Sequence, residues 1–156
     1  MNKKTYLIAI VVLLLDQVSK SLITIYFKLN QSVKVIANFF YITFVQNTGG
    51  AWSIFENHSS ILIIASIVAF LILIKFMFHF QNNLRNNFAF GLTFGGILSN
   101  LADRIFLGHV RDFLDFRIWG YHYPVFNIAD IAIVLGVLLL IIAILKGEDN
   151  REGNCS

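Results

Sequence analysis

Charged residues are scarce in this sequence, making up only 13% of its 156 residues, whereas hydrophobic residues make up 57%. So few charges cannot cover the exterior of a water-soluble domain of this length, which excludes an ordinary soluble globular protein. The single proline leaves long apolar stretches free to form uninterrupted helices. The composition therefore indicates a protein whose main solvent is lipid.

Cysteine is almost absent, because the only one, Cys155, lies next to the C-terminal residue. A lone cysteine excludes an internal disulfide, and the sequence has no Cys/His cluster with metal-ligand spacing. We therefore expect neither a metal nor another cofactor, and an incidental role for Cys155. The net charge of +3 comes from scattered basic residues, so no nucleic-acid partner is expected either.

Four hydrophobic stretches follow one another along the chain, at residues 6–27, 61–78, 88–107 and 124–145. At about 1.5 Å per residue, each is about long enough to cross a hydrocarbon core of about 30 Å. We therefore expect one domain over residues 1–156, an all-α polytopic membrane protein with four transmembrane helices. The first stretch is expected to be retained, because Asp16 and Lys20 interrupt it and no clear cleavage site follows.

The connections between these stretches differ in character. Residues 28–60 include a β-branched and aromatic run at 33–45, then the turn-like Asn47-Thr48-Gly49-Gly50 and a second apolar piece at 51–55. This pattern predicts a small extracytoplasmic sheet or hairpin on the outer membrane surface. Residues 108–123 are expected to form an outer loop, whose many aromatic side chains suit a membrane interface.

The topology follows from the number of spans and from the N-terminal lysines. Four spans place both termini on the same side, and Lys3 and Lys4 favour the cytoplasm for that side. The segments 28–60 and 108–123 would then lie outside. The polar tail at 147–156 is expected to be disordered in the cytoplasm.

Asp16 and Lys20 lie inside the first apolar stretch, where ionisable residues are costly and mark candidate functional positions. They are spaced i, i+4 with the acid first, which is the order that favours an ion pair within a helix. Two roles are open for this pair. It either anchors the helix alone or supports a functional site.

The third stretch combines a stripe of small residues with polar ones. Small residues recur every four positions from Gly91 to Ser99, which allows another helix to approach closely. Asn100, Asp103 and Arg104 would then face the bundle interior at the outer end of this helix. Plain helix packing with an interfacial salt bridge explains the glycines but leaves Asn100 unexplained.

Asn127 and Asp130 have the spacing of a capping box at the start of a helix. A helix that begins there has only residues 131–145 free of charge, or about 22 Å at about 1.5 Å per residue, which is short for a span. We therefore expect the fourth helix to begin near Pro124, with a length of about 33 Å. Asp130 would then lie about 9 Å along it, at membrane depth, as a candidate acid or base.

Asp112 follows the third stretch, and Asp130 lies near the start of the fourth. A short return loop can therefore bring the two carboxylates together at the outer membrane boundary. Neighbouring carboxylates share one proton, so that one can act as base on a water while the other protonates a peptide carbonyl oxygen. The residues thus predict a catalytic pair, Asp112 and Asp130.

Two other functions are compatible with buried acids. In a proton-coupled carrier or channel component, Asp16, Asp103 and Asp130 would relay protons, which requires carboxylates spread through the membrane depth. In a non-catalytic assembly protein, the buried charges would only pair helices. Exchange of an aspartate for asparagine would then cost only modest stability.

Five motifs, in order along the chain, resemble those of the lipoprotein signal peptidases, also called signal peptidase II. They are Asp16-Gln17-Val18-Ser19-Lys20, Asn47-Thr48-Gly49-Gly50-Ala51-Trp52-Ser53, Ser99-Asn100-Leu101-Ala102-Asp103-Arg104, Val110-Arg111-Asp112-Phe113 and Phe126-Asn127-Ile128-Ala129-Asp130. The resemblance covers nearly the whole chain, from the first apolar stretch to the last.

The resemblance implies a bacterial cytoplasmic-membrane aspartic endopeptidase, with its active site toward the outer leaflet and with Asp112 and Asp130 as catalytic residues. Its substrates would be prolipoproteins that bear diacylglycerol on a cysteine, and cleavage would fall just before that cysteine. Membrane lipid surrounds such an enzyme, and no cofactor or obligate protein partner is implied. The same matching assigns substrate-binding or site-supporting roles to Asn47, Gly49, Asn100, Asp103, Arg104, Asn127, Asp16 and Lys20.

Three positions depart from the usual family pattern. Ser99 and Gly50 stand where glycine and alanine are common, and Arg111 stands where an aliphatic residue is common. Arg111 would lower the pKa of Asp112 if the two side chains were neighbours in space. In a strand, however, adjacent side chains point to opposite sides, and the carboxyl would escape this effect.

Overall fold

The computed structural model describes residues 2–50 and 58–149, and within these ranges it contains four long helices and one four-stranded sheet. The helices are α1 (Lys3–Tyr26), α2 (Ser59–Met77), α3 (Leu84–Leu107) and α4 (Ile128–Leu145). The strands are β1 (Ser32–Ile36), β2 (Phe40–Asn47), β3 (Val110–Ile118) and β4 (Tyr121–His122), paired antiparallel in the order β1-β2-β3-β4. The four predicted helices are confirmed, with bounds a few residues from those expected.

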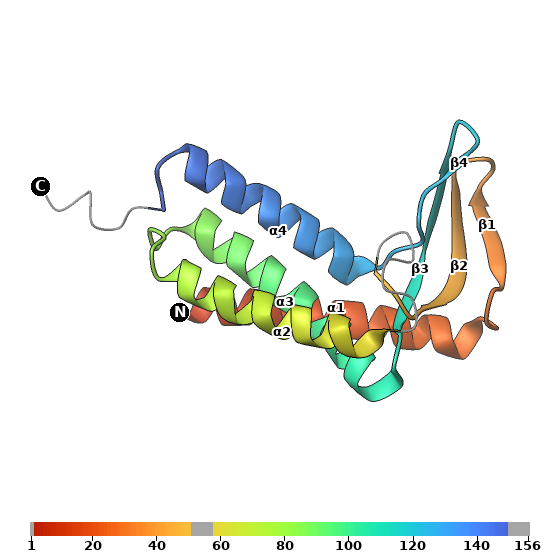
Figure 1. Cartoon of the computed structure of the whole chain (residues 1–156). Coiled ribbons are helices and arrows are strands. Elements are labelled where there is room, and N and C mark those ends of the chain that lie inside the picture. The colour runs from red at the N-terminus through yellow and green to blue at the C-terminus, as the bar shows by residue number, and fades with distance from the viewer. Residues whose placement is uncertain (1, 51–57, 150–156) are drawn as a thin grey trace, which may run out of the picture.

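The sheet stands across one end of the helix bundle (Figure 1). Its strands run crosswise to the helix axes, and the beginning of α1 and the end of α4 lie together at the opposite end of the bundle. The ends of α1 and α3 and the beginning of α4 therefore meet the sheet. This arrangement gathers residues from distant parts of the sequence at one end of the molecule.

Three of the described helices, α1, α2 and α4, are long and apolar enough to cross a membrane. Many of their large apolar side chains face outward, as Leu14 and Leu138 do. The remaining helix, α3, is less apolar because it carries polar residues such as Asn86 and Asn100, which are buried. It packs against each of the other three helices, so protein surrounds these polar groups.

Glycines of α3 allow this central position. A Cβ atom on Gly95 would lie 2.6 Å from the carbonyl oxygen of Ala9 in α1, and one on Gly96 would lie 2.5 Å from that of Ala129 in α4. Both distances are too short for a real side chain, so only glycine permits these contacts. The predicted close packing along the stripe of small residues is therefore confirmed at the contact with α1. Gly96, which lies outside that stripe, allows a similar close approach to α4.

Gly95→Ala is expected to lower the free energy of unfolding by about 1–3 kcal/mol, because α1 and α3 must move apart to admit the methyl group. Thermal unfolding in detergent would report this change as a lower midpoint. Ala65→Val adds more atoms at an exposed position of α2 and should leave the midpoint unchanged. Equal midpoints for the two variants would contradict the close approach of α1 to α3.

The fourth helix begins one residue after Asn127, and the expected start near Pro124 is wrong. The Asn127 side chain accepts a hydrogen bond from the Asp130 amide (3.0 Å), and Asp130 accepts one from the Asn127 amide (3.1 Å). The preceding residue, Phe126, exchanges backbone hydrogen bonds with β3 and is held outside the helix. Asp130 therefore lies in the first turn, and the 18 residues of α4 still span about 27 Å.

Residues 108–123 do not form the expected outer loop, because they contain β3 and β4. β3 is an inner strand of the sheet and pairs with β2 along most of its length. Its charged residues interrupt the apolar pattern and hide the strand in the sequence, although Asp112 and Asp115 are buried. The prediction thus includes a small sheet within residues 28–60 but omits the two strands that residues 108–123 add to it.

The hairpin predicted within residues 28–60 is confirmed by β1 and β2. The apolar piece at 51–55 lies outside the described residues, as do Cys155 and most of the polar tail. The first tail residues are held in place, because Glu148 pairs with Arg85 and accepts a hydrogen bond from Asn83 (2.7 Å). The expected disorder is therefore wrong for the tail residues before 150.

Candidate active site

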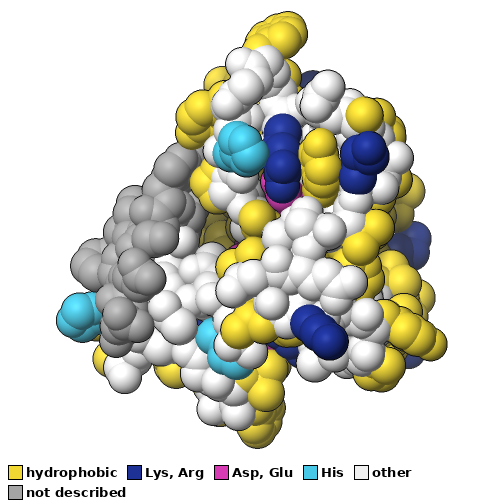
Figure 2. Space-filling model, turned by 90° about the vertical axis from the view of Figure 1, so that its right-hand side faces the viewer, with side chains coloured by type: hydrophobic (Ala, Val, Ile, Leu, Met, Phe, Trp, Pro, Cys, Tyr) yellow, Lys and Arg dark blue, Asp and Glu magenta, His cyan; other side chains and the backbone are white. Residues whose placement is uncertain are grey.

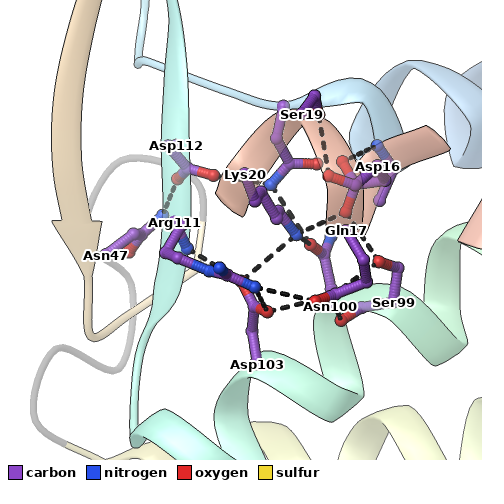
Figure 3. Close-up of polar contacts among 12 residues, drawn as sticks. Asp16, Gln17, Ser19, Lys20, Asn47, Ser99, Asn100, Asp103, Arg111 and Asp112 are labelled. Carbon is purple, nitrogen blue, oxygen red and sulfur yellow. Dashed lines mark hydrogen bonds and ion pairs between the residues drawn. The ribbon is translucent and has the colours of Figure 1, made fainter. Parts of the chain in front are cut away.

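The predicted site residues lie together where α1, α3 and the start of α4 meet β2 and β3. Figure 3 shows six of them, Asp16, Lys20, Asn47, Asn100, Asp103 and Asp112. Hydrogen bonds and ion pairs connect them into one network. The members are Asp16, Lys20, Asn47, Gly49, Asn100, Asp103, Arg104, Asp112, Asn127 and Asp130. The network has two parts, a carboxyl pair that faces a cavity and an ion cluster behind it.

The carboxyl pair consists of Asp112 in β3 and Asp130 in α4. Asp112 is only 2% exposed, and its carboxylate accepts hydrogen bonds from Asn127 Nδ2 (2.6 Å) and Asn47 Nδ2 (2.9 Å). Asp130 accepts a hydrogen bond from Asn100 Nδ2 (2.7 Å). Both carboxyls line the same cavity, so the fold brings together two acids from separate elements.

Burial raises the pKa of the Asp112 carboxyl to about 7, and the neighbouring charge of Asp130 adds to this effect. Hydrogen bonds from Asn47 and Asn127 and the ammonium of Lys20 act in the opposite direction, because each stabilises the carboxylate form. The Asp112 carboxyl therefore holds a proton at pH values where an ordinary aspartate is ionised. Such a group can give a proton to a substrate near neutral pH.

Asn100 connects the carboxyl pair to the ion cluster. Its Oδ1 accepts hydrogen bonds from Lys20 Nζ (2.8 Å) and from Asn127 Nδ2 (3.1 Å). Because these two donors hold the oxygen on one side, the Nδ2 of Asn100 points to Asp130. Asn100, which helix packing alone does not explain, therefore orients the Asp130 carboxyl.

The ion cluster consists of Asp16, Lys20, Asp103 and Arg111, and the first three are almost fully buried. Lys20 Nζ lies 2.6 Å from Asp16 and 3.3 Å from Asp103, which confirms the predicted i, i+4 pair. Asp16 also accepts a hydrogen bond from the Ala129 amide (2.9 Å) and so holds the beginning of α4 against α1. Buried charges of this kind are costly to separate, because removal of one partner leaves the other uncompensated.

Three residues of the network, Gln17, Ser99 and Arg111, are not among the predicted site residues. Arg111 points toward Asp103 and away from Asp112 (Figure 3), as adjacent residues of a strand do. Gln17 donates a hydrogen bond to Asp103 (2.9 Å) and accepts one from Arg111 (2.7 Å). The signal for Gln17 in the sequence is a polar side chain next to Asp16 within an apolar stretch.

The serine at position 99 also takes part in the network. The Ser99 hydroxyl donates a hydrogen bond to Asp16 (2.6 Å) and accepts one from Gln17 (3.0 Å). A glycine, which the resemblance leads us to expect at this position, has no hydroxyl to make these contacts. This departure therefore strengthens the connection between α1 and α3.

The turn after β2 is tied to the site by two polar side chains. Asn47 Oδ1 accepts a hydrogen bond from the Gly49 amide (2.9 Å), and the Arg104 guanidinium donates one to the Gly49 carbonyl (3.2 Å). These contacts hold the turn close to α3. They also place Gly50, the next residue, in the wall of the cavity.

The cavity beside the carboxyl pair has a volume of 590 Å³ and a lining that is both polar and apolar. Polar side chains such as Asn100 and Arg104 line part of it, and apolar side chains of α4 such as Ile131 and Leu135 line another part. A second hollow of 410 Å³ meets the first at Asp112 and is lined by the end of β2 and by residues 122–125. The site can therefore hold a molecule that has both a polar backbone and an apolar part.

Seen from the sheet end, the acidic side chains are almost completely covered, while basic and hydrophobic side chains reach the surface (Figure 2). Asp115 in β3 is one of the covered acids. Burial opposes its ionisation, but hydrogen bonds from Arg117 and Thr43 lower the pKa of Asp115 overall. The pKa of Asp112, three residues earlier, is raised instead, because burial and the charge of Asp130 outweigh the hydrogen bonds that it accepts from the amides of Asn47 and Asn127.

The four acids of the network lie in one connected group at the sheet end. A proton relay requires carboxylates at successive depths, so this grouping disfavours a carrier or channel component. In the described ranges, no group of three or more His, Cys, Asp or Glu side chains is arranged to hold a metal ion.

A pair of buried carboxyls connected by amides, at the end of a bundle of apolar helices, is the kind of site that a membrane-bound aspartic peptidase requires. Comparison with known proteins identifies the type. The sequence profile of the family described as "Signal peptidase (SPase) II" matches residues 8–146 of the chain. The chain belongs to the signal peptidase II family.

Relatives and solved structures agree with this assignment. Two proteins named lipoprotein signal peptidase, from Staphylococcus aureus strains bovine RF122 / ET3-1 and JH9, are 39% and 40% identical to it, over 97% of each chain. Two solved structures described as bacterial membrane enzymes superpose with TM-scores of 0.83 and 0.80, at 37% and 39% identity. The first match covers 97% of this chain and 93% of the other, and the second covers 91% and 92%.

Proposed function

We propose that this chain is an endopeptidase that removes the signal peptide from diacylglyceryl-modified bacterial prolipoproteins, cutting just before the lipid-bearing cysteine. Membership of the family and the name of the relatives, lipoprotein signal peptidase, support this proposal. The observation that carries it is the cavity that Asp112 and Asp130 line together with polar and apolar side chains. The polar side chains suit a peptide backbone, and the apolar side chains suit the hydrophobic part of a substrate held in lipid.

In this proposal Asp112 and Asp130 are the catalytic residues. Asp112, whose raised pKa lets it keep the shared proton, gives that proton to the oxygen of the peptide carbonyl. Asp130 takes a proton from the water that attacks the carbonyl carbon. The tetrahedral intermediate then collapses. One of its hydroxyls gives its proton to Asp112 as the carbonyl forms again, the C–N bond breaks, and Asp130 gives its proton to the leaving amine.

The residues around the pair have positioning or substrate-binding roles in this proposal. Asn100 and Asn127 orient the two carboxyls through their amide groups. Arg104 lines the cavity beside the turn and can donate to carbonyl oxygens of a bound peptide. The supporting set is Asn47, Gly49, Asn100, Asp103, Arg104, Asn127, Asp16 and Lys20.

The proposed enzyme is a single domain whose four helices all cross the bacterial cytoplasmic membrane. The 24 residues of α3 extend about 36 Å, which is sufficient for a span, and its polar groups face the other helices. Lys3 and Lys4 favour the cytoplasm for the end that carries both termini. The sheet and the site would then lie at the outer leaflet, with membrane lipid around them.

Two forms of one prolipoprotein, with and without diacylglycerol on the cysteine, test the proposal with purified enzyme in detergent or nanodiscs. We expect cleavage of the modified form, with the lipid-bearing cysteine as the new N-terminal residue in mass spectrometry. The unmodified form should be cleaved far more slowly. Equal cleavage of the two forms, or cleavage at another bond, would contradict the proposed substrate.

Asn47→Ala is expected to shift the pH dependence of cleavage to higher pH. Asp112 must be protonated to act as the acid, so the rate falls as the pH rises through its pKa of about 7. The hydrogen bond from Asn47 lowers this pKa, and its removal lets the proton remain at higher pH. The descending limb of the rate against pH should therefore move up by roughly half a unit or more.

Gln46→Ala is the matched control, because Gln46 precedes Asn47 in β2 and, although it lines the second hollow, it is not among the groups that shift the pKa of Asp112. Its descending limb should coincide with that of the unmodified enzyme. A limb that moves to lower pH in Asn47→Ala, or that moves equally in both variants, would show that this hydrogen bond does not set the protonation of Asp112.

A further inference from the structure

Arg111 binds Asp103 through its side chain and its backbone. The guanidinium donates hydrogen bonds to both carboxylate oxygens of Asp103 (2.7 and 3.2 Å), and the Arg111 amide donates a third (3.1 Å). The same guanidinium donates to Gln17 (2.7 Å) in α1. Two parallel bonds to one carboxylate fix the plane of the guanidinium, which a single bond would not do.

The charge of the ion cluster is balanced only when Arg111 is counted. Asp16 and Asp103 supply two negative charges, and Lys20 and Arg111 supply two positive charges. Without Arg111, one uncompensated negative charge would remain in the cluster. This charge would lie directly behind Asn100, which contacts the carboxyl pair.

The position of Lys20 depends on how Asp103 is neutralised. Lys20 Nζ lies 2.8 Å from the oxygen of Asn100 but 3.3 Å from Asp103. Asp103 has Arg111 as a second cation, so it does not draw the ammonium away from Asn100. Without Arg111, Asp103 would attract Lys20 more strongly, and the hydrogen bond that orients Asn100 toward Asp130 would weaken.

We propose that Arg111 is a positioning residue for the peptidase reaction, because it balances Asp103 and leaves Lys20 in place to hold Asn100 against the carboxyl pair. The inference rests on the proposed function. It also gives a role to the cation that stands where an aliphatic residue is common in the family. Arg111 itself points toward Asp103 and away from Asp112 (Figure 3), and the lining of the cavity does not include it, so in this inference it acts through Asp103 and Lys20.

A pH profile separates this role from simple stabilisation of the fold. The charged groups that face Asp112 are Asp130 of α4, Lys20 of α1 and Arg104 of α3, besides the amides of Asn47 and Asn127. Of these, the ammonium of Lys20 is the group that Arg111 holds in place. A displaced ammonium stabilises the Asp112 carboxylate less, so the descending limb should move to higher pH.

Arg111→Leu is the test, and Arg117→Leu is the matched control on the same strand. Arg117 forms an ion pair with Asp115 (2.7 Å) outside the ion cluster. Arg111→Leu should lower the cleavage rate by roughly tenfold and move the limb up by roughly half a pH unit. Arg117→Leu should change neither quantity.

Arg111→Gln also removes the positive charge but can still donate a hydrogen bond to Asp103, so it replaces Arg111→Leu if that variant does not fold, and its descending limb should likewise move to higher pH. Two further variants restore the charge balance. Arg111→Lys keeps the positive charge, and the double variant Arg111→Leu/Asp103→Asn removes one charge of each sign. The descending limb should return to its original pH in both, even if the rate stays low. Limbs at the original pH in every variant, or equal effects of Arg111→Leu and Arg117→Leu, would overturn the inference.

The outcome for Asp112→Asn distinguishes this inference from the proposed function. An inactive Asp112→Asn together with an unaffected Arg111→Leu overturns the inference alone. A fully active and folded Asp112→Asn overturns the proposed function.

Discussion

Asp112→Asn and Asp130→Asn should each lower the rate of cleavage by at least about 10³-fold while folded protein remains in the membrane. Asparagine has the size of aspartate, and its oxygen can still accept a hydrogen bond from Asn100 or Asn127. It cannot hold or exchange the shared proton, however, so the water is not activated. In cells with this chain as their only enzyme of this type, lipidated and uncleaved prolipoprotein should accumulate on immunoblots.

Asp115→Asn is the control for these two variants. Asp115 is a buried acid of the same strand as Asp112, but its partners are Thr43 and Arg117, outside the cavity. It should process prolipoprotein at the unmodified rate. Normal processing by a well-expressed Asp112→Asn or Asp130→Asn would remove the catalytic assignment and leave the helix-pairing role of a non-catalytic assembly protein.

Lys20→Met should produce the largest loss of stability, about 3–5 kcal/mol. Methionine fills most of the space of the lysine stem but leaves Asp16 and Asp103 without the ammonium between them. Both carboxylates are buried, so water cannot replace the lost cation. The change should appear as a lower yield of folded protein and a lower midpoint of thermal unfolding in detergent.

Arg85→Met is the matched comparison, because it also removes the cation of an ion pair. The side chains of Arg85 and Glu148 are 24% and 18% exposed, so water can solvate the remaining carboxylate. The cost should be at most about 1 kcal/mol. If Lys20→Met were no less stable than Arg85→Met, the buried ion cluster would not be a principal support of the bundle.

The residue at which α4 begins depends on the local sequence and on a tertiary contact. The spacing of Asn127 and Asp130 indicates a capping box, but the argument from span length favours a start near Pro124. The capping box forms because Phe126 pairs with β3, a strand whose charged residues conceal it in the sequence. The expected start near Pro124 is wrong because the helix does not need the extra residues. From Ile128 onward α4 is already about 27 Å long, close to the hydrocarbon thickness of about 30 Å.

The direction of the Arg111 side chain likewise depends on tertiary structure. The sequence leaves open whether this cation acts on Asp112 or points elsewhere, because the answer depends on whether the segment is a strand. Pairing of β3 with β2 directs Asp112 toward Asn47 and Asn127, and Arg111 toward Asp103. Arg111, which departs from the pattern expected of the family, therefore does not pair with the carboxyl pair. It supplies the second cation of the ion cluster.

The sequence by itself determined that lipid is the main solvent, that four helices form, that Asp16 and Lys20 pair, and which acids are candidates for catalysis. These features are local, because hydropathy, helical spacing and the cost of a buried charge act over a few turns. Tertiary structure alone decided where α4 begins, which way Arg111 points, and that Asn100 and Asn127 join the carboxyl pair to its supports. Each of these depends on hydrogen-bond partners that are distant in the chain and meet only when the strands pair and the helices pack.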